Sequence, residues 1–219
     1  MTGIVLLGPP GVGKGTQARR LNASLGLLYL STGDALRQAV SAGTELGRKV
    51  KDVMASGKLV SDDLVGEVVA AALAGLPASS NGFLLDGFPR TLRQVAILDG
   101  ILENAHLTLD HALFIDAPED ILIRRVTGRR VCPACEAVFH VDSKSPAKPD
   151  VCDACGGALV QRKDDSEGVV TERLRVYRTE TTPVVAVYSE RGILRRIDGA
   201  GAADAVYDLI VQSLRGVAA

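Results

Sequence analysis

All four cysteines of this 219-residue chain lie in one short segment, in the pattern C-x2-C-x16-C-x2-C. They are Cys132, Cys135, Cys152 and Cys155. Two short C-x2-C turns allow four thiolates to converge on one tetrahedral metal ion. Two disulfides are the alternative, and they would need an oxidising compartment that nothing else in the sequence indicates. The spacing therefore predicts a zinc site, and four protein ligands leave zinc no open position for catalysis.

A glycine-rich loop near the N-terminus has the residue types that bind phosphate. Residues 8–16 read Gly-Pro-Pro-Gly-Val-Gly-Lys-Gly-Thr. Successive backbone N–H groups and a following helix N-terminus attract a phosphate group, and Lys14 can reach its oxygens as a point charge. Gly15 stands where the general motif has Ser or Thr, so the hydroxyl moves to Thr16. A glycine-rich turn with a chance lysine is disfavoured by the strand predicted before it and the helix after it.

A carboxylate and several arginines add the other groups that phosphoryl transfer uses. Asp86 follows an apolar run and precedes Gly-Phe-Pro-Arg. An anion there could orient magnesium-bound water, although a helix cap or turn would also use an aspartate. Phosphoryl transfer depends on positioning and charge neutralisation. The candidate arginines are Arg37, Arg90, Arg125, Arg129, Arg162 and Arg173. Each alone could be an ordinary surface arginine, but together they gather at loop ends near the motifs.

Short apolar runs that alternate with helical patterns must position these residues. The strand candidates are residues 3–7, 27–30, 83–86, 112–116 and 193–197. This rhythm predicts βαβ units, a five-stranded parallel sheet and a three-layer, doubly wound α/β core. Such a core binds ligands at the C-terminal edge of its strands. Residues 31–60 and 128–165 do not fit the rhythm and are predicted to be insertions.

The bulk composition excludes some classes of protein. The chain has 25 Lys and Arg against 26 Asp and Glu, a formal net charge of −1. This balance argues against a surface that coats a polyanion. The apolar run at residues 4–7 is too short for a signal peptide and lacks a basic leader, and no stretch approaches the ~18 apolar residues that span a bilayer. We therefore expect a soluble, cytoplasmic protein.

Taken together, the motifs resemble those of the adenylate kinase family, and the likeness runs essentially from end to end. The strings that carry it begin at Gly8, Ser31 (Ser-Thr-Gly-Asp-Ala-Leu-Arg), Gly57 (Gly-Lys-Leu-Val), Asp86 (Asp-Gly-Phe-Pro-Arg-Thr), Gly128 (Gly-Arg-Arg) and Arg162 (Arg-Lys-Asp-Asp). The Asp-Gly-Phe-Pro-Arg string and the Gly-Lys-Gly-Thr form of the phosphate loop are specific to nucleoside monophosphate kinases. Arg93, where many members have proline, is a mild departure that should not touch the chemistry.

The resemblance implies a division of the site between two nucleotides. The residues implied for ATP are Gly11, Val12, Gly13, Lys14, Gly15, Thr16, Arg125, Arg129, Val138, Phe139 and Gly201. Those implied for AMP are Thr32, Arg37, Lys58, Leu59, Val60, Gly87, Phe88, Pro89, Arg90, Gln94, Arg162 and Arg173. The implied catalytic groups are Lys14, Asp86, Arg90, Arg129, Arg162 and Arg173.

The resemblance also implies an organisation and a reaction. Residues 1–30, 61–127 and 166–219 would form the core, residues 31–60 the AMP-binding insert, and residues 128–165 a zinc-binding lid. The reaction would be Mg²⁺-dependent transfer from ATP to AMP, giving two ADP. We expect a monomer whose partners are ATP, AMP and ADP, without nucleic acid or membrane.

Three other interpretations compete with this one. A related kinase could use UMP, CMP or GMP as acceptor, although Thr32 and Gln94 favour AMP. A zinc-ribbon nucleic-acid-binding ATPase would need a basic ribbon, whereas residues 132–155 hold two lysines against four acidic residues. A non-catalytic homologue is disfavoured because the lysine and every arginine are present.

Overall fold

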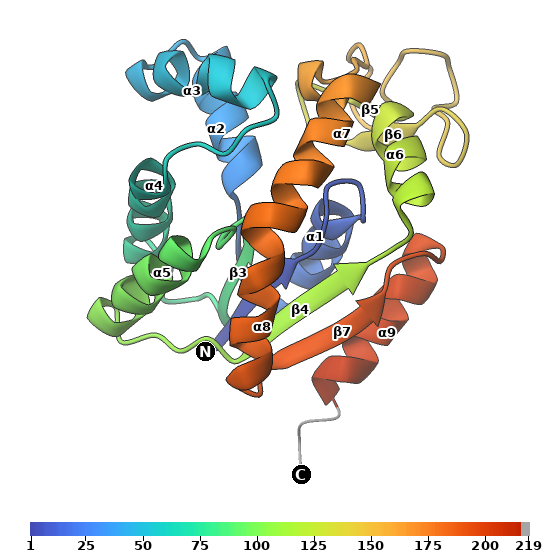
Figure 1. Ribbon diagram of the computed structural model, residues 1–219. Helices are drawn as coiled ribbons and strands as arrows, with labels where there is room; N and C mark the ends of the chain where they lie inside the picture. Colours follow the sequence, from blue (N-terminus) through green and yellow to red (C-terminus); the bar gives the residue numbers. More distant parts are fainter. Residues whose placement is uncertain (216–219) are drawn as a thin grey trace.

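The computed structural model describes residues 1–215 and is built around one parallel sheet. Its five strands lie in the order β2-β3-β1-β4-β7 (Figure 1). They are β1 (Thr2–Leu7), β2 (Leu28–Ser31), β3 (Gly82–Asp86), β4 (His111–Asp116) and β7 (Leu194–Asp198). Each overlaps one of the apolar runs named from the sequence, so the predicted doubly wound α/β core is confirmed.

The central strand β1 separates two hydrophobic cores. Successive side chains of a strand point to opposite faces, and both faces of a parallel sheet are covered by helices. Val5 and Leu7 accordingly pack on one face, and Ile4 and Leu6 pack on the other. Among the helices of the first core are α4 (Asp62–Ala74), α5 (Leu92–Asn104) and α8 (Thr182–Glu190); among those of the second are α1 (Lys14–Leu25), α6 (Glu119–Thr127) and α9 (Ala203–Arg215).

The register of the strands brings three functional segments to one edge of the sheet. Leu6 of β1 pairs with Asp86 of β3, and Ser31 of β2 pairs with the same aspartate. The phosphate loop leaves β1 just beyond this point, and α2 (Thr32–Ser41) starts directly after β2. The C-terminal edge of the sheet thus carries the loop, Asp86 and the start of α2 together.

Two segments project from this edge (Figure 1). One holds α2 and α3 (Glu45–Ala55), between β2 and α4. The other holds the antiparallel pair β5 (Arg129–Val131) and β6 (Val138–His140), followed by the 3-10 turn η1 (Lys163–Asp165). Within residues 1–215, no helix is both long enough and apolar enough to span a membrane.

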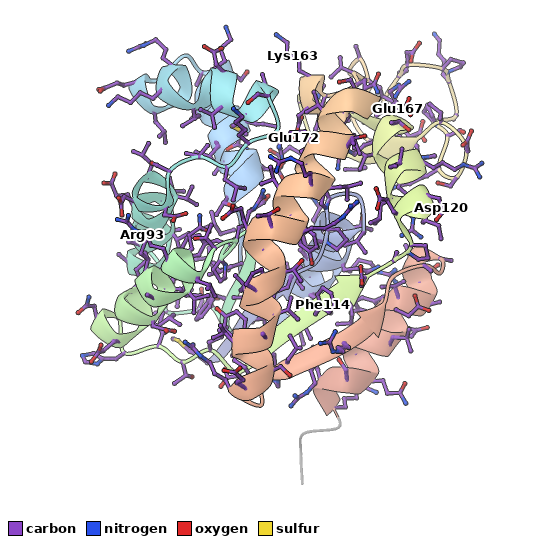
Figure 2. The ribbon with its side chains drawn as sticks, viewed as in Figure 1. Arg93, Phe114, Asp120, Lys163, Glu167 and Glu172 are labelled. Carbon is purple, nitrogen blue, oxygen red and sulfur yellow. The ribbon has the colours of Figure 1, made fainter. Side chains whose placement is uncertain are left out.

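A long helical rod runs from the second projection back to the core. It consists of α7 (Glu167–Val176), the π-helical segment η2 (Tyr177–Thr181) and α8. The alternating charges of α7 are typical of a solvated face, and Glu167 and Glu172 lie near its outer end (Figure 2). That interpretation holds for only part of the helix, because Val170 and Leu174 are buried against the core.

Candidate functional site

Lys14 stands at the start of α1 and its ammonium is enclosed by the phosphate loop. Gly13, the N-cap residue, has φ 103 and lets the chain turn sharply into the helix. Lys14 Nζ donates to the carbonyl oxygens of Gly8 (2.7 Å) and Pro9 (3.0 Å). Burial, helped by the charges of nearby arginines, lowers the pKa of Lys14 to about 8, although Asp86 opposes the shift. The loop therefore holds a cation that a phosphate group can stabilise.

Asp86 faces this loop from the end of β3, and its side chain is largely buried. A Cβ atom at Gly15 would lie 3.5 Å from Asp86 Oδ2. The glycine that replaces the hydroxyl residue of the general motif thus lies directly against the carboxylate. Tyr29 Oη lies 3.5 Å from the same oxygen. Oxygen donors are what Mg²⁺ prefers, so Asp86 fits a hydrated magnesium ion bound with the phosphates.

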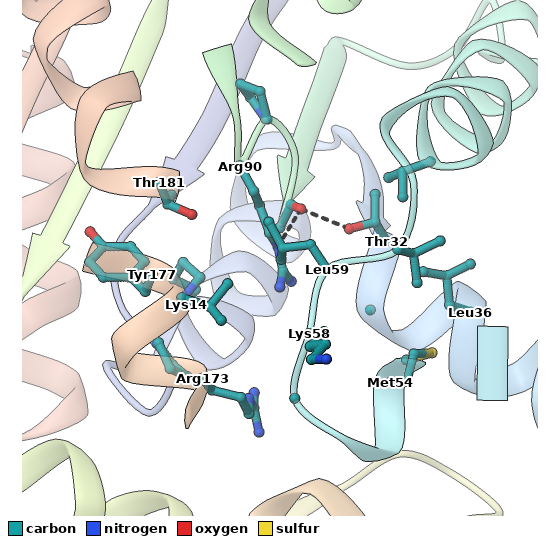
Figure 3. Close-up of a pocket in the computed structure, with 18 of the residues that line it drawn as sticks. Lys14, Thr32, Leu36, Met54, Lys58, Leu59, Arg90, Arg173, Tyr177 and Thr181 are labelled. Carbon is teal, nitrogen blue, oxygen red and sulfur yellow. Dashed lines mark hydrogen bonds between the residues drawn. The ribbon is translucent and has the colours of Figure 1, made fainter. Parts of the chain in front are cut away.

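A pocket opens beside Lys14, between α2, α3, the turn after β3 and α7 (Figure 3). Of the residues predicted for AMP, it is lined by Thr32, Arg37, Lys58, Leu59, Val60, Gly87, Pro89, Arg90, Gln94 and Arg173. Phe88 does not line it, because its side chain is fully buried in the core. Arg162 does not line it either, and contacts α2 at Asp34 instead.

Hydrogen bonds fix one wall of this pocket. Thr32 Oγ1 donates to the carbonyl oxygen of Gly87 (3.0 Å), and Arg90 Nε donates to the same oxygen (2.7 Å) (Figure 3). Gln94 Oε1 accepts from the backbone N–H of Arg90 (2.7 Å), while its amide donates to Asp62 (2.8 Å). Burial lowers the pKa of Arg90 to about 10, with Arg173 adding repulsion. The wall holds its guanidinium in place.

Four of the other arginines are held by three carboxylates. Arg129 forms a two-point contact with the fully buried Asp165. Arg173 Nη1 lies 3.0 Å from Asp164 Oδ2 and 3.2 Å from Asp165 Oδ1. Asp34 Oδ1 accepts from Arg37 (2.6 Å) and Arg162 (3.0 Å). Four guanidinium groups from both projecting segments and α7 are thus preorganised around the mouth of the site.

Sequence reasoning missed several residues of the site. Asp34, Asp164 and Asp165 lie inside the motifs quoted from the sequence. The arginines that stand close to them in those motifs were the signal that could have identified them. The remaining side chains of the pocket wall include Leu36, Met54, Val65, Tyr177 and Thr181. Tyr177 and Thr181 bound the π-helical segment η2, a feature often found at functional sites that no sequence pattern indicates.

The remaining residues predicted for ATP lie in two places, one around α6 and the loop after β7 and the other on β6. Arg125 donates to the carbonyl oxygens of Gly199 (2.6 Å), Ala200 (2.9 Å) and Gly201 (2.9 Å). Val138 and Phe139 lie on β6, and Phe139 is buried beside the cysteines. Arg125 therefore fixes the loop that would carry the adenine-binding carbonyl.

The four cysteines meet in the second projection, and their geometry fits zinc. All four sulfur atoms lie within 4.8 Å of one another. Cys132 Sγ is 3.4 Å from Cys155, and Cys135 Sγ is 3.5 Å from Cys152. A disulfide needs about 2.05 Å, whereas four thiolates around zinc lie about 3.8 Å apart. A Cβ atom at Gly157 would lie only 3.3 Å from Cys132 Sγ, so a glycine there leaves room for the cluster.

Comparison with known proteins agrees with this geometry. Residues 6–193 match the family described as adenylate kinase. An adenylate kinase of Kosmotoga olearia is 47% identical over 214 residues, which cover 98% of this chain and 99% of the relative. One of Moorella thermoacetica is 48% identical over 211 residues, covering 96% and 97%. One of Archaeoglobus fulgidus is 45% identical over 196 residues, covering 90% of each. The chain, with its glycine-rich loop and the pocket beside Lys14, thus belongs to the adenylate kinase family of phosphotransferases.

Proposed function

We propose that this chain transfers the γ-phosphoryl group of Mg²⁺-bound ATP to AMP, reversibly, giving two ADP. Family membership supports the reaction class. The observation that carries the assignment is that Lys14, in the phosphate loop, also lines the pocket of Arg90, Thr32 and Gln94. A donor phosphate on the loop and an acceptor phosphate in the pocket would meet at this lysine.

On the donor side, the backbone from Gly11 to Thr16 would hold the β- and γ-phosphates, with Lys14 as the mobile cation. Arg129 would contact the phosphates from the lid, and Arg125 would pack near the adenine. The carbonyl oxygen of Gly201 would accept a hydrogen bond from the adenine, and the lid backbone near Val138 and Phe139 would reach ATP. The three hydrogen bonds of Arg125 to the Gly199–Gly201 loop support this role, because they hold that carbonyl in a defined place.

On the acceptor side, Arg37 and Arg90 would bind the AMP phosphate, since a guanidinium group can make two parallel hydrogen bonds to it. The base would lie between the apolar side chains of the pocket, near the segment Lys58, Leu59 and Val60. Gln94 supports adenine, because a side-chain amide can pair with both a donor and an acceptor of that base. Gln94 is nearly fully buried, and its hydrogen bonds with Arg90 and Asp62 would hold the amide in one orientation for such pairing.

For the transfer itself, Arg162 and Arg173 would flank the moving phosphoryl group and neutralise the charge that it spreads in the transition state. They are already oriented by Asp34, Asp164 and Asp165, so little reorganisation is needed when phosphate oxygens replace the carboxylates. Asp86 would orient magnesium-bound water. The metal ion, when bound, would supply positive charge that neutralises the phosphate oxygens.

Residues 31–60 and 128–165 would act as the AMP-binding insert and the lid, and the rest of residues 1–215 as the core. Residues 216–219, also assigned to the core from the sequence, lie outside the described residues. Closure would exclude water, which would otherwise accept the phosphoryl group in place of AMP. Zinc would bind Cys132, Cys135, Cys152 and Cys155 and stabilise the lid, since this small unit has few buried apolar residues of its own. We expect the active form to be a cytoplasmic monomer.

A panel of acceptors tests the assignment. ADP formation from ATP and Mg²⁺ would be measured with AMP, UMP, CMP and GMP. We expect kcat/KM for AMP to exceed that for each other acceptor by at least about a hundredfold, because a site that pairs with one base rejects another. A preference for UMP, CMP or GMP would replace the assignment by that of a related monophosphate kinase.

A further inference from the structure

Glu136 has a left-handed backbone conformation, and the equivalent position in the other C-x2-C turn of the lid is a glycine, Gly156. The two C-x2-C turns have matching hydrogen bonds. In the first turn, Cys132 N–H donates to Ala137 O and Glu136 N–H donates to Cys132 O. In the second turn, Cys152 N–H donates to Gly157 O and Gly156 N–H donates to Cys152 O. In each turn, the residue that follows the second cysteine has a left-handed backbone, with φ 59 at Glu136 and φ 73 at Gly156. This conformation is unfavourable for a residue with a Cβ atom. Glu136 therefore carries a backbone strain that the glycine of the second turn avoids.

The side chain of Glu136 reaches out of the lid and contacts two other parts of the molecule. Glu136 Oε1 accepts a hydrogen bond from Gln38 Nε2 at 2.6 Å, although 98 residues separate them. Glu136 Oε2 lies 3.8 Å from Nη2 of Arg19. Gln38 is on α2, the helix that carries Thr32 and Arg37, and Arg19 is on α1, directly after the phosphate loop.

We propose that Glu136 is a positioning residue that holds the lid against the acceptor-side helix α2 and the phosphate-loop helix α1. This inference rests on the proposed function, in which the lid closes over both nucleotides. Zinc ligation would set the turn that ends at Cys135, and the left-handed backbone at the next residue directs the carboxylate across to Gln38. The same residue thereby links the metal-stabilised turn to the two helices that carry substrate-binding groups.

The strength of the contact suits a reversible link. The side chains of Glu136 and Arg19 are 42% and 35% exposed, so water and salt screen the ion pair. The hydrogen bond from Gln38 has a charged acceptor and is the stronger part. Such a contact would bias the lid toward the closed position without preventing product release, which requires it to open.

Variants at Glu136 separate a positioning role from a structural one. Glu136→Ala removes the contact, and Glu136→Gly also removes the backbone strain. Asp150→Ala is a matched control, because Asp150 is an exposed acidic residue of the same lid with the same φ of 59. Gln38→Ala removes the partner at a position outside the zinc-binding turn.

Two measurements apply to each variant. Small-angle X-ray scattering of the nucleotide-free protein gives its radius of gyration, and steady-state assays give kcat and the KM for AMP. We expect Glu136→Ala to increase the radius of gyration and to raise the KM for AMP about two- to fivefold, the range for an exposed charged contact. The kcat should stay within about twofold, since Glu136 does not touch the reacting groups. Asp150→Ala should match the unmodified protein in all three.

Glu136→Gly gives the sharpest contrast. Relief of the left-handed strain should raise its melting temperature, while the KM for AMP should rise as in Glu136→Ala. Combining Gln38→Ala with Glu136→Ala should add less than the two separate effects, as expected for residues in contact. The proposal is overturned if Glu136→Ala and Asp150→Ala scatter alike, or if Glu136→Gly keeps the original KM. Because the scattering comparison uses no nucleotide, a wrong acceptor assignment would leave it intact.

Discussion

Asp34 and Arg162 face each other at 3.0 Å across the mouth of the site, although 128 residues separate them in the chain. Asp34 belongs to α2 and Arg162 lies at the end of the lid segment, just before η1. Although burial opposes it, the charges of Arg37 and Arg162 hold the pKa of Asp34 below its usual value. This carboxylate therefore stays ionised and orients arginines from both projecting segments before any phosphate group arrives.

Replacing Lys14 by methionine should remove nearly all activity while the protein stays folded. The substitution deletes the cation at the β/γ-phosphates, and a preorganised electrostatic contact of this kind contributes about 3–4 kcal/mol to transition-state stabilisation. We expect kcat to fall by at least about a hundredfold. Assays and circular dichroism on Lys14→Met provide the check, and a fall of less than about tenfold would remove Lys14 from this role.

The affinity of the unmodified protein for ATP should decrease above pH 8. The pKa of Lys14 is lowered to about 8 in the nucleotide-free protein, so its charge is lost as the pH rises through that value. Phosphate groups, with a second pKa near 6, are already fully ionised there. Bound phosphate favours the charged lysine, so the affinity should fall by up to about tenfold per pH unit above pH 8. Calorimetric titrations between pH 7 and 9.5 measure it, and Lys14→Met should show no such dependence.

Arg37→Ala and Arg90→Ala should weaken the binding of AMP much more than that of ATP. Both side chains line the acceptor pocket, and a hydrogen bond to a charged group contributes about 1.5–3 kcal/mol. We expect AMP to bind about ten- to a hundredfold more weakly in separate titrations with each nucleotide. Arg93→Ala is the matched control, because Arg93 lies on the outside of α5 and pairs with Asp63 of α4 (Figure 2). Equal losses for both nucleotides would mean that the two subsites are wrongly assigned.

Substituting Arg129, Arg162 or Arg173 by alanine should act mainly on turnover. These guanidinium groups would neutralise charge that develops only in the closed complex, so kcat should fall by a larger factor than the nucleotide dissociation constants rise. We expect a loss in kcat of at least about a hundredfold. Arg175→Ala serves as the control on α7, the helix of Arg173, since Arg175 is exposed and pairs with Glu172. A loss of affinity with an unchanged kcat would argue against this role.

Replacing Cys132 and Cys135 by serine should destabilise the protein without abolishing catalysis. The cluster has four thiolate ligands and no open position, so its metal ion would stabilise the lid and take no part in the transfer. We expect the melting temperature to fall by about 5 °C or more, with appreciable activity remaining in the cold. Elemental analysis should find one zinc per chain before the substitution and none after it. Complete loss of activity in a folded double variant with an ordered lid would indicate a catalytic metal instead.

The sequence alone was sufficient to predict the parallel sheet and the two sites that have a local sequence motif, the phosphate loop and the cysteine cluster. The central strands β1 and β3 are almost entirely buried, and burial on both faces selects short continuous apolar segments. The edge strands β2 and β7 are only partly buried, and β7 contains two arginines. The phosphate loop and the cysteine cluster depend on spacing within a few residues, where backbone sterics and ligand geometry leave few alternatives.

Only the tertiary structure decided how the charged residues pair. Asp34, Asp164 and Asp165 could have been surface carboxylates. Each has an arginine partner from a segment distant in the sequence: Arg162 for Asp34, Arg37 for Asp164 and Arg129 for Asp165. Phe88 lies inside a site motif, yet its side chain fills the core because the turn after β3 directs it inward. The contact of Glu136 with Gln38 likewise depends on the relative placement of two projecting segments. Local patterns report short-range sterics and burial, whereas these contacts depend on distances that the whole chain sets.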